Sequence, residues 1–336
     1  MGGAHSVYVM VAVNLYAVGQ SMFSSRSLNL TAVLNSAHLK LSGVPIEGAG
    51  VVWEFFAGSA VWTKALAKRG YAYLTPIEIT DCRHFDLLNY LFVEKCILIL
   101  RAKLVDAAHF GTPCSSLSIA ITPPRRNAEY QLGVPDLVGV AAAKVRDGNA
   151  LSAVAAQLIG VCDECGVAVT DENPATSWHW KLPVIIALSA RALAFEALLC
   201  YCAYGTLWRK QTRIRGNRIW VERLAAKSPG CLSHQPLRGS TFHEGRWKPW
   251  TAVASSYPSR LVSCWSKLIA DNVDVSGEKK QQCEQLLHAC RNDVQSTESG
   301  LTPLPGANLN LVGLGNDRLL TVGRVSRYSH IDDHLT

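Results

Sequence analysis

The sequence lacks any uninterrupted apolar run long enough to cross a bilayer. Its N-terminal apolar stretch, residues 7–18, is broken by Asn14 and has no basic segment of the kind that begins a secretory signal. A second apolar stretch, residues 182–204, carries Arg191 and Glu196, which is typical of a packed helix that leads into a strand. We therefore expect no membrane segment and no signal peptide, and an intracellular location in the nucleus or cytoplasm.

The sequence also lacks a recognisable framework of disulfides or metal ligands, although it contains 11 cysteines. The number is odd, and several cysteines lie in apolar runs, where a free thiol packs as a small hydrophobe. Cys162 and Cys165 form a CxxC pair, but no second pair follows at zinc-ribbon spacing. Cys231 with His234 is equally incomplete. These residues are interpreted as structural, in a reducing compartment, and no metal is predicted.

Charged residues are few, at 18%, while 49% of the residues are apolar, as in a globular protein with a large core. The 336 residues suffice for one large α/β domain with additions. The net charge of +7 is unevenly spread, because residues 206–260 alone carry +9 and the rest of the chain is near −2. This local excess favours a polyanionic partner, although a solvated basic surface explains it equally well.

Short apolar runs alternate with amphipathic helical patterns from Gly48 onward, which predicts a mostly parallel, doubly wound, Rossmann-like α/β sheet. The expected strands are 51–55, 72–77, 104–110 and 167–170, with a further strand starting at 201. The expected helices are 61–69, the later part of 86–99, 150–162, 182–199 and 257–270. Residues 49–275 form the expected main domain, with a small basic loop insert at 216–250. Residues 1–48 are expected to be a helical or partly ordered extension. Residues 276–336 are expected to be a largely disordered tail that begins with polar, helix-like residues to about residue 290.

A turn of small residues follows the first expected strand and allows a ligand to approach the backbone closely. The turn comprises Phe55, Phe56, Ala57, Gly58 and Ser59. It is neither a dinucleotide GxGxxG nor a P-loop. Glu78 and Ile79 end the second expected strand, where a carboxylate can accept ribose hydroxyls, and Asp86 is expected at the end of a third strand, near an adenine amino group. This order favours S-adenosylmethionine over a dinucleotide as the cofactor.

Two further segments place a thiol and a carboxylic acid at strand ends. Cys114 follows Pro113, and the serines after it are expected to cap a helix whose N-terminus lowers the pKa of the thiol. Taken alone, such a cysteine is more often inert. Glu172 precedes Asn173 and Pro174, and a buried carboxyl with a raised pKa is a candidate general acid. The Asn-Pro pair taken alone is equally a helix cap.

These three segments resemble, in order, those of the DNA (cytosine-5) methyltransferases of the compact, phage-like type. EFFAGSA, from Glu54, is similar to their cofactor turn, GTPCSS to their Pro-Cys loop, and DENP to their Glu-Asn motif. The resemblance covers residues 51–270 and implies a class I S-adenosylmethionine-dependent methyltransferase. It implies that Cys114 attacks C6 of a cytosine flipped from its stack, while Glu172, beside Asn173, protonates or hydrogen-bonds N3. C5 then takes the methyl group.

A fourth segment, from Tyr204, resembles the family region that places basic residues around the flipped base, and it can be aligned in two registers. One register assigns that role to Lys210 and Thr212, as in phage-like members, and it is preferred. The other assigns the role to Arg213 and Arg215.

Departures from the family pattern keep two alternatives open, a catalytically degenerate protein that binds nucleic acid without turnover and a cytosine-5 RNA methyltransferase. The departures are Ala60, Thr112 and Ser115, together with the lack of a long insert that could recognise a target sequence. The small basic insert offers three tryptophans that can stack on bases or belong to the core, namely Trp220, Trp247 and Trp250. An amino-group methyltransferase is disfavoured, because its chemistry wants an aromatic residue where Cys114 stands. A monomer is expected.

Overall fold

The structure is a computed structural model that describes residues 29–299, with side chains as far as residue 290. Its centre is a seven-stranded sheet in the order β1-β3-β2-β4-β5-β7-β6. Four neighbouring strands run parallel, namely β3 (Ala72–Leu74), β2 (Val51–Phe55), β4 (Ala107–Phe110) and β5 (Ala168–Pro174). The strand β1 (Leu41–Ser42) is antiparallel to β3, and β7 (Gln211–Gly216) is antiparallel to both β5 and β6 (Phe195–Cys200). The expected α/β class with a mostly parallel sheet is confirmed, and the arrangement is compatible with a Rossmann-like fold.

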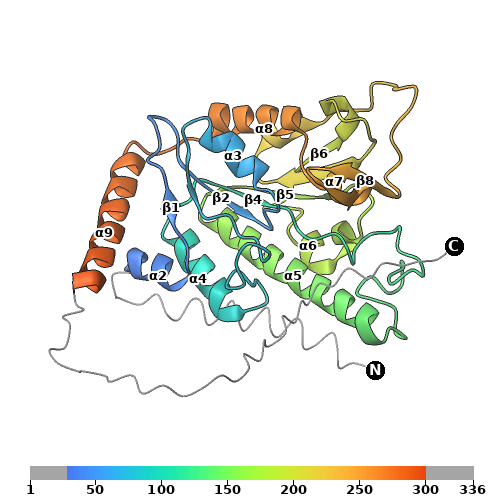
Figure 1. Cartoon of the computed structure of the whole chain (residues 1–336), viewed down its shortest axis with the longest axis horizontal. Coiled ribbons are helices and arrows are strands. Elements are labelled where there is room, and N and C mark those ends of the chain that lie inside the picture. The colour runs from blue at the N-terminus through green and yellow to red at the C-terminus, as the bar shows by residue number, and fades with distance from the viewer. Residues whose placement is uncertain (1–28, 300–336) are drawn as a thin grey trace, which may run out of the picture. The chain divides into compact units, whose positions relative to one another are not determined.

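Helices cover both faces of the sheet (Figure 1). The helices α3 (Val61–Ala67) and α8 (Ser259–Asn272) pack on one face, and α2 (Leu30–Ser36), α4 (Tyr90–Arg101) and α5 (Gly139–Glu164) pack on the other. Because side chains alternate along a strand, β2 feeds both cores. Trp53 and Phe55 join the α4–α5 core, where the Phe55 ring stacks on that of Phe110 with centroids 4.5 Å apart. Val52 joins the α3–α8 core.

Several expected elements are confirmed, and others are wrong. The first strand has the expected bounds, whereas α5 begins at Gly139 rather than near residue 150. The helix expected over residues 182–199 is wrong: α6 covers only Pro183–Ile186, and Phe195–Cys200 forms β6. That stretch is apolar almost throughout, so its period could not separate a helix from a strand. The strand expected from residue 201 is instead a 3₁₀ turn, η2 (Tyr201–Tyr204).

The described domain extends past both ends of the expected 49–275 segment. Leu34 of α2 and Leu41 of β1 are buried in the core, so residues 29–48 belong to the sheet domain. The helix α9 (Lys279–Ser299) starts with Lys279, whose Nζ donates to the carbonyl oxygens of Lys103 and Leu104 and lies 3.2 Å from Asp106 Oδ1. The first part of the expected tail, residues 279–299, is therefore a helix, as the helix-like residues to about residue 290 suggest. Residues 1–28 and 300–336 lie outside the described part of the chain.

Glu54, in β2, gives a testable dependence of stability on pH. Its side chain is 1% exposed, its Oε2 accepts hydrogen bonds from Thr63 N (2.9 Å) and Oγ1 (2.6 Å), and burial raises its pKa from 4.5 to about 7. Between those values the folded protein keeps a proton that the unfolded chain releases, so stability falls as pH rises. Glu54→Gln keeps a hydrogen-bond acceptor but has no charge. We expect its free energy of unfolding to rise relative to that of the wild type by up to about 3 kcal/mol as pH increases across this range. Urea denaturation at a series of pH values measures this, and a pH-independent difference would contradict it.

Candidate active site

The carboxyl ends of β2 and β4 form a topological switch point, because β3 pairs with one edge of β2 and β4 with the other. Open α/β sheets bind ligands at such points. The loops after these strands approach closely, since a Cβ added to Gly111 would lie 3.1 Å from the Phe56 carbonyl oxygen and 2.9 Å from Tyr257 Oη. A side chain at this position would have to displace Tyr257. Two cavities, of about 380 and 400 Å³, lie elsewhere, beside Lys279, and neither is lined by Cys114.

The residues expected to bind the cofactor are only partly brought together. Gly58 and Ser59 are exposed, and the Gly58 amide donates to Glu78 Oε2 at 2.8 Å. Pro113 lies in the neighbouring loop after β4, and Ala57 and Phe56 connect the turn to β2. Ile79, next to Glu78, is 39% exposed.

Two of these cofactor assignments are corrected by the structure. The Phe55 side chain is fully buried against Phe110, so only its backbone faces the turn, where its carbonyl accepts from Gly111 N at 3.0 Å. No strand ends at Asp86 in this described stretch. Asp86 lies in the loop before α4, and its Oδ1 accepts a hydrogen bond from Leu88 N at 2.9 Å. The pattern of the sequence did not reveal that residues 81–89, between β3 and α4, form no strand.

The environment of Cys114 differs from the expected one. The residues after it form a turn, closed by Leu117 N donating to the Cys114 carbonyl at 2.9 Å, and the next helix is α5, from Gly139. Without a helix N-terminus, burial dominates and raises the pKa of the half-buried thiol. The Lys210 ammonium opposes this shift and the Glu172 carboxylate adds to it, so both groups act on the sulfur. The expected lowering of the Cys114 pKa is therefore wrong.

Glu172 stands near the end of β5 and is 7% exposed. Its Oε2 accepts a hydrogen bond from Tyr257 Oη at 3.4 Å, and its Oε1 lies 3.7 Å from Lys210 Nζ with no hydrogen-bond partner among the described residues. Burial raises the pKa of Glu172, and the Lys210 charge only partly offsets that shift. The direction agrees with the general acid that the sequence suggested.

Three aromatic or imidazole side chains complete the site, and the sequence interpretation missed them. His109 Nε2 lies 2.8 Å from Tyr257 Oη, and burial lowers the His109 pKa to about 3, so this ring is neutral. Lys210 Nζ lies 4.7 Å from the centroid of the Tyr201 ring and 3.4 Å from its hydroxyl oxygen. Because these partners come from β4, η2 and the segment before α8, no local motif could have signalled them.

The pairing of β7 with β5 distinguishes the two alignments of the fourth segment, one of which selects Lys210 and Thr212 and the other Arg213 and Arg215. Burial lowers the pKa of Lys210, but Glu172, Tyr201 and Cys114 together raise it above its usual value, which keeps the amine charged. Arg213 and Arg215 instead lie 3.3 and 3.5 Å from Glu196 Oε2. The structure therefore brings Lys210, rather than the arginines, to Glu172. Thr212, of the preferred register, is buried opposite Pro174.

Asn173 joins the end of β5 to the cysteine loop. Its Nδ2 donates to the Thr112 carbonyl oxygen at 2.7 Å, and Thr112 Oγ1 donates to Asp171 Oδ1 at 3.0 Å. Asp171 Oδ2 in turn lies 2.7 Å from His179 Nε2, and both of these side chains are fully buried. Asn173 thus holds the cysteine loop to the end of β5, which is a positioning role.

Arg126 holds the cysteine loop against α5. Its guanidinium is 3% exposed and donates to the carbonyl oxygens of Ser116 (2.9 Å) and Gln131 (2.7 Å) and to Asn149 Oδ1 (2.7 Å). Replacing it leaves these buried acceptors unpaired. We expect Arg126→Leu to lower the free energy of unfolding by roughly 3 kcal/mol in urea denaturation, and Arg125→Leu, at the half-buried neighbour, to change it far less. Equal losses for the two variants would contradict this role.

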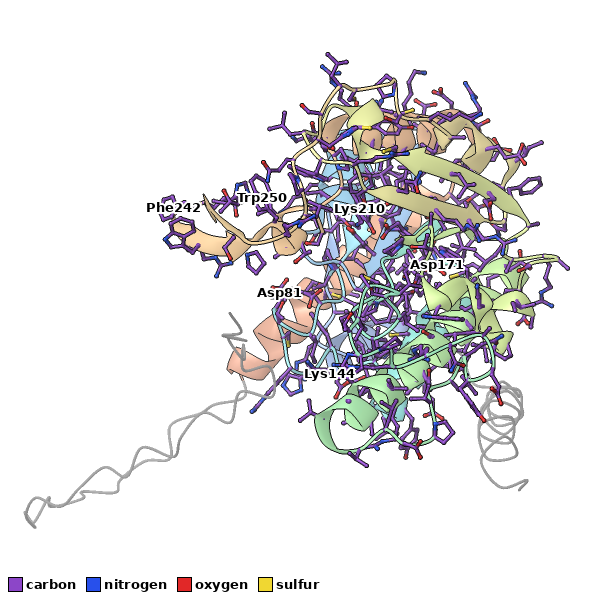
Figure 2. All side chains as sticks on the ribbon, turned by 90° about the vertical axis from the view of Figure 1, so that its right-hand side faces the viewer. Asp81, Lys144, Asp171, Lys210, Phe242 and Trp250 are labelled. Carbon is purple, nitrogen blue, oxygen red and sulfur yellow. The ribbon has the colours of Figure 1, made fainter. Side chains whose placement is uncertain are left out.

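The basic segment includes a hairpin of β8 (Ser240–His243) and β9 (Arg246–Pro249). Phe242 and Trp247 are 63% and 72% exposed, with ring centroids 5.9 Å apart. Figure 2 shows Phe242 at the outer end of this hairpin, away from Lys210. The two other tryptophans differ, because Trp220 is 3% exposed and belongs to the core, while the Trp250 ring lies 6.1 Å from that of Trp208. Stacking on a base is thus excluded for Trp220.

Comparison of the chain with models of protein families, with curated proteins and with solved structures found no match. Among residues 29–299, the helices do not combine the length and the apolar character that a membrane crossing requires. Any functional conclusion therefore depends on the site itself.

Proposed function

We propose that this chain is an S-adenosylmethionine-dependent methyltransferase that acts on C5 of cytosine in DNA through a covalent bond to Cys114. One observation carries the proposal: at one edge of the sheet, the thiol of Cys114 lies within the electrostatic reach of a buried carboxyl, Glu172, and of the Lys210 ammonium. Oε1 of that carboxyl has no hydrogen-bond partner in the described structure, and such an orphaned buried acceptor suits a ligand.

The residues of the turn after β2 suit the cofactor. The Gly58 amide and the Glu78 carboxylate face each other at 2.8 Å, which sets a donor and an acceptor at an exposed turn. Ribose hydroxyls can replace the amide as donors to Glu78, and Ser59 offers a further hydroxyl. When bound, S-adenosylmethionine supplies an electrophilic methyl group on its sulfonium sulfur.

The chain's own residues supply the rest of the chemistry. Deprotonated Cys114 bonds through Sγ to C6 of the cytosine, the C5–C6 π electrons move toward N3, and Glu172 gives its proton to N3. C5 is thereby made nucleophilic and takes the methyl group. The cycle ends when water or hydroxide removes the C5 proton, the C6–S bond breaks to return the thiolate, and the N3 proton returns to Glu172. Lys210 stabilises the thiolate throughout, because its charge lies near the sulfur.

DNA is the proposed substrate because of the basic segment between residues 206 and 260, where the net charge is +9. Cations bind phosphates regardless of sequence, and the exposed Phe242 and Trp247 can stack on bases. The small size of this insert favours weak sequence discrimination.

One observation favours a second candidate function, nucleic-acid binding without turnover. Burial raises the pKa of Cys114, so the resting thiol is protonated at neutral pH, and Glu78 is already bonded to Gly58 and to Thr80 Oγ1 (3.1 Å). In a catalytically degenerate protein, Cys114 would remain protonated and Glu78 would remain bonded within its turn. Only the basic segment would then have a function, the binding of nucleic acid.

Trapping on 5-fluorocytosine tests the proposal. Fluorine at C5 cannot leave as a proton, so the C6–S bond persists after methyl transfer and an adduct survives denaturing electrophoresis. We expect an adduct with fluorinated DNA that requires S-adenosylmethionine and is lost in Cys114→Ser. An adduct with RNA alone would overturn the choice of DNA. Binding to both polymers with no adduct to either would overturn the enzyme and leave the second candidate.

Substitution of Lys210 tests which alignment of the segment from Tyr204 is correct. Because the Lys210 charge lowers the pKa of Cys114, Lys210→Gln should displace the pH–rate profile for methyl transfer to higher pH and slow the reaction at neutral pH. Arg213→Gln is the matched control, since Arg213 pairs with Glu196. An unchanged profile for Lys210→Gln, or an equal displacement for both variants, would contradict this assignment.

A further inference from the structure

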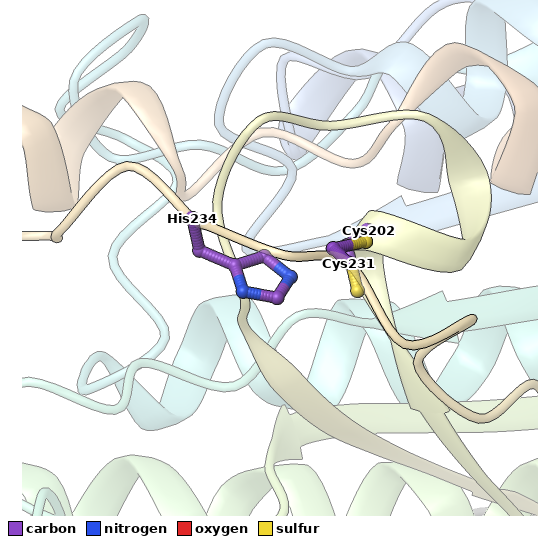
Figure 3. Close-up of side chains that lie close together, drawn as sticks. All are labelled: Cys202, Cys231 and His234. Carbon is purple, nitrogen blue, oxygen red and sulfur yellow. The ribbon is translucent and has the colours of Figure 1, made fainter.

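A cluster of soft metal-ligating side chains lies outside the candidate active site, at the outer end of β6. Cys202 belongs to η2, and Cys231 and His234 belong to the loop between η3 (Ile219–Leu224) and β8. One potential ligand atom of each lies within 4.8 Å of the others, and the three side chains converge in Figure 3. A further thiol, that of Cys200, has its Sγ 3.1 Å from the Cys202 Sγ.

The sequence could not reveal this cluster, because a long segment that contains β7 separates its two halves. Cys200 and Cys202 form a CxC pair, and Cys231 and His234 form a CxxH pair far along the chain. Each pair alone is incomplete as a metal site. Antiparallel pairing of β6 with β7 and the return of the loop after η3 bring the halves together. The interpretation of Cys231 and His234 as a fragment without partners is therefore revised.

The donor atoms have the chemistry of a structural zinc site. They are three sulfurs and one imidazole, with no carboxylate in the group. Sulfurs that share a tetrahedral zinc lie roughly 3.8 Å apart, since each Zn–S bond is about 2.3 Å. The Cys200 and Cys202 sulfurs are closer, at 3.1 Å, and the ligand atoms of Cys202, Cys231 and His234 lie within 4.8 Å of one another. His234 Nε2 is buried and has no hydrogen-bond partner within the described chain, which leaves its lone pair for an ion.

We propose that Cys202, Cys231 and His234 bind a zinc ion, with Cys200 as the fourth ligand. A closed set of three cysteines and one histidine is typical of structural zinc rather than catalytic zinc. The proposal does not depend on methyl transfer.

Such an ion would fasten the loop before the β8–β9 hairpin to the end of β6. The loop that it would fasten is exposed at Cys231 and at the neighbouring Leu232, which is 106% exposed. Tyr201 lies between Cys200 and Cys202 in the chain, and its ring contacts Lys210. Zinc at this position would therefore also stabilise the backbone that positions Lys210.

Metal content of the full-length protein, expressed with zinc in the medium and purified under reducing conditions, tests the proposal. We expect about one zinc per chain by mass spectrometry of the metal. We expect Cys231→Ser and His234→Ala each to lose this zinc, whereas Cys264→Ser, at a half-buried cysteine on α8, keeps it. Circular dichroism checks that the variants remain folded.

Cobalt replacement keeps the proposal testable even where a variant fails to fold. Co²⁺ added to the metal-free wild type should show thiolate charge-transfer bands and the intense visible bands of tetrahedral coordination. Three results would each overturn the proposal: no stoichiometric zinc together with no tetrahedral cobalt spectrum, zinc retained by both ligand variants, or a disulfide between Cys200 and Cys202 in the reduced preparation. Methylation is not measured in any of these arms, so failure here leaves the proposed enzyme untouched.

Discussion

Cys114→Ser is expected to slow methyl transfer to cytosine by roughly 10⁴-fold or more, as removal of a catalytic nucleophile does in other enzymes. A serine hydroxyl has almost the same size as the thiol but is a far weaker nucleophile at neutral pH. Single-turnover transfer of a labelled methyl group from S-adenosylmethionine to a cytosine-containing duplex measures this rate. The affinity of the variant for DNA should stay within about threefold of the wild type, since the basic segment is unchanged.

Cys165→Ser is the matched control for this loss. Cys165 is also half-buried, and it ends α5 in the CxxC pair, away from Glu172 and Lys210. We expect wild-type transfer from this variant. A Cys114→Ser protein that still methylates cytosine at more than a small fraction of the wild-type rate would exclude covalent catalysis by this residue.

Glu172→Gln is expected to reduce the same rate by about 10²- to 10³-fold, the range for loss of a general acid. Glutamine keeps a hydrogen-bonding group near N3 but has no acidic proton to transfer. The carboxyl proton is available because burial raises the pKa of Glu172. Asp163→Asn serves as the control, because Asp163 lies at the end of α5 and pairs with Arg191 (3.6 Å).

The pH profile distinguishes a proton donor from a residue that only holds the site together. The reaction needs the thiolate of Cys114 and the acid form of Glu172 together, and the pKa of each group is raised by burial. The wild-type rate should therefore rise about tenfold per pH unit below the pKa of Glu172, stay level between that pKa and the higher pKa of the thiol, and fall above the latter. The Glu172→Gln variant has no acid form to lose, so its rate should continue to rise up to the pKa of the thiol. If both proteins show the same level region, Glu172 does not supply the proton.

The sequence predicted much of the sheet because local patterns determine those elements. A short apolar run followed by small residues gives β2 over Val51–Phe55, and amphipathic spacing gives α8 near its observed bounds. The strand-end positions of Cys114 and Glu172 followed from the same patterns, since parallel strands share one carboxyl edge. The 182–199 segment is apolar almost throughout, so its pattern fits the helical period and the strand period equally. Pairing with β7 decides that its last part is the strand β6.

Other features were decided only by tertiary structure. The pKa of Cys114 depends on burial and on the absence of a following helix, and neither is encoded in the five or six residues around the thiol. The choice of Lys210 over Arg213 depends on which carboxylate each side chain meets, since Lys210, just before β7, lies beside Glu172, whereas Arg213, in β7, pairs with Glu196 of β6. His109 and Tyr257 meet Glu172 from distant segments, and the cluster of Cys202, Cys231 and His234 forms only when two loops meet.

The amino-acid sequence by itself determined which chemical groups the protein has and which strand ends carry them, because apolar patterns and turn residues act over a few neighbouring positions. The tertiary structure decided which groups are neighbours and in what protonation state they stand. Charge interactions and burial depend on distances in space, and the position of a residue along the chain does not give those distances before the sheet and its helices have packed together.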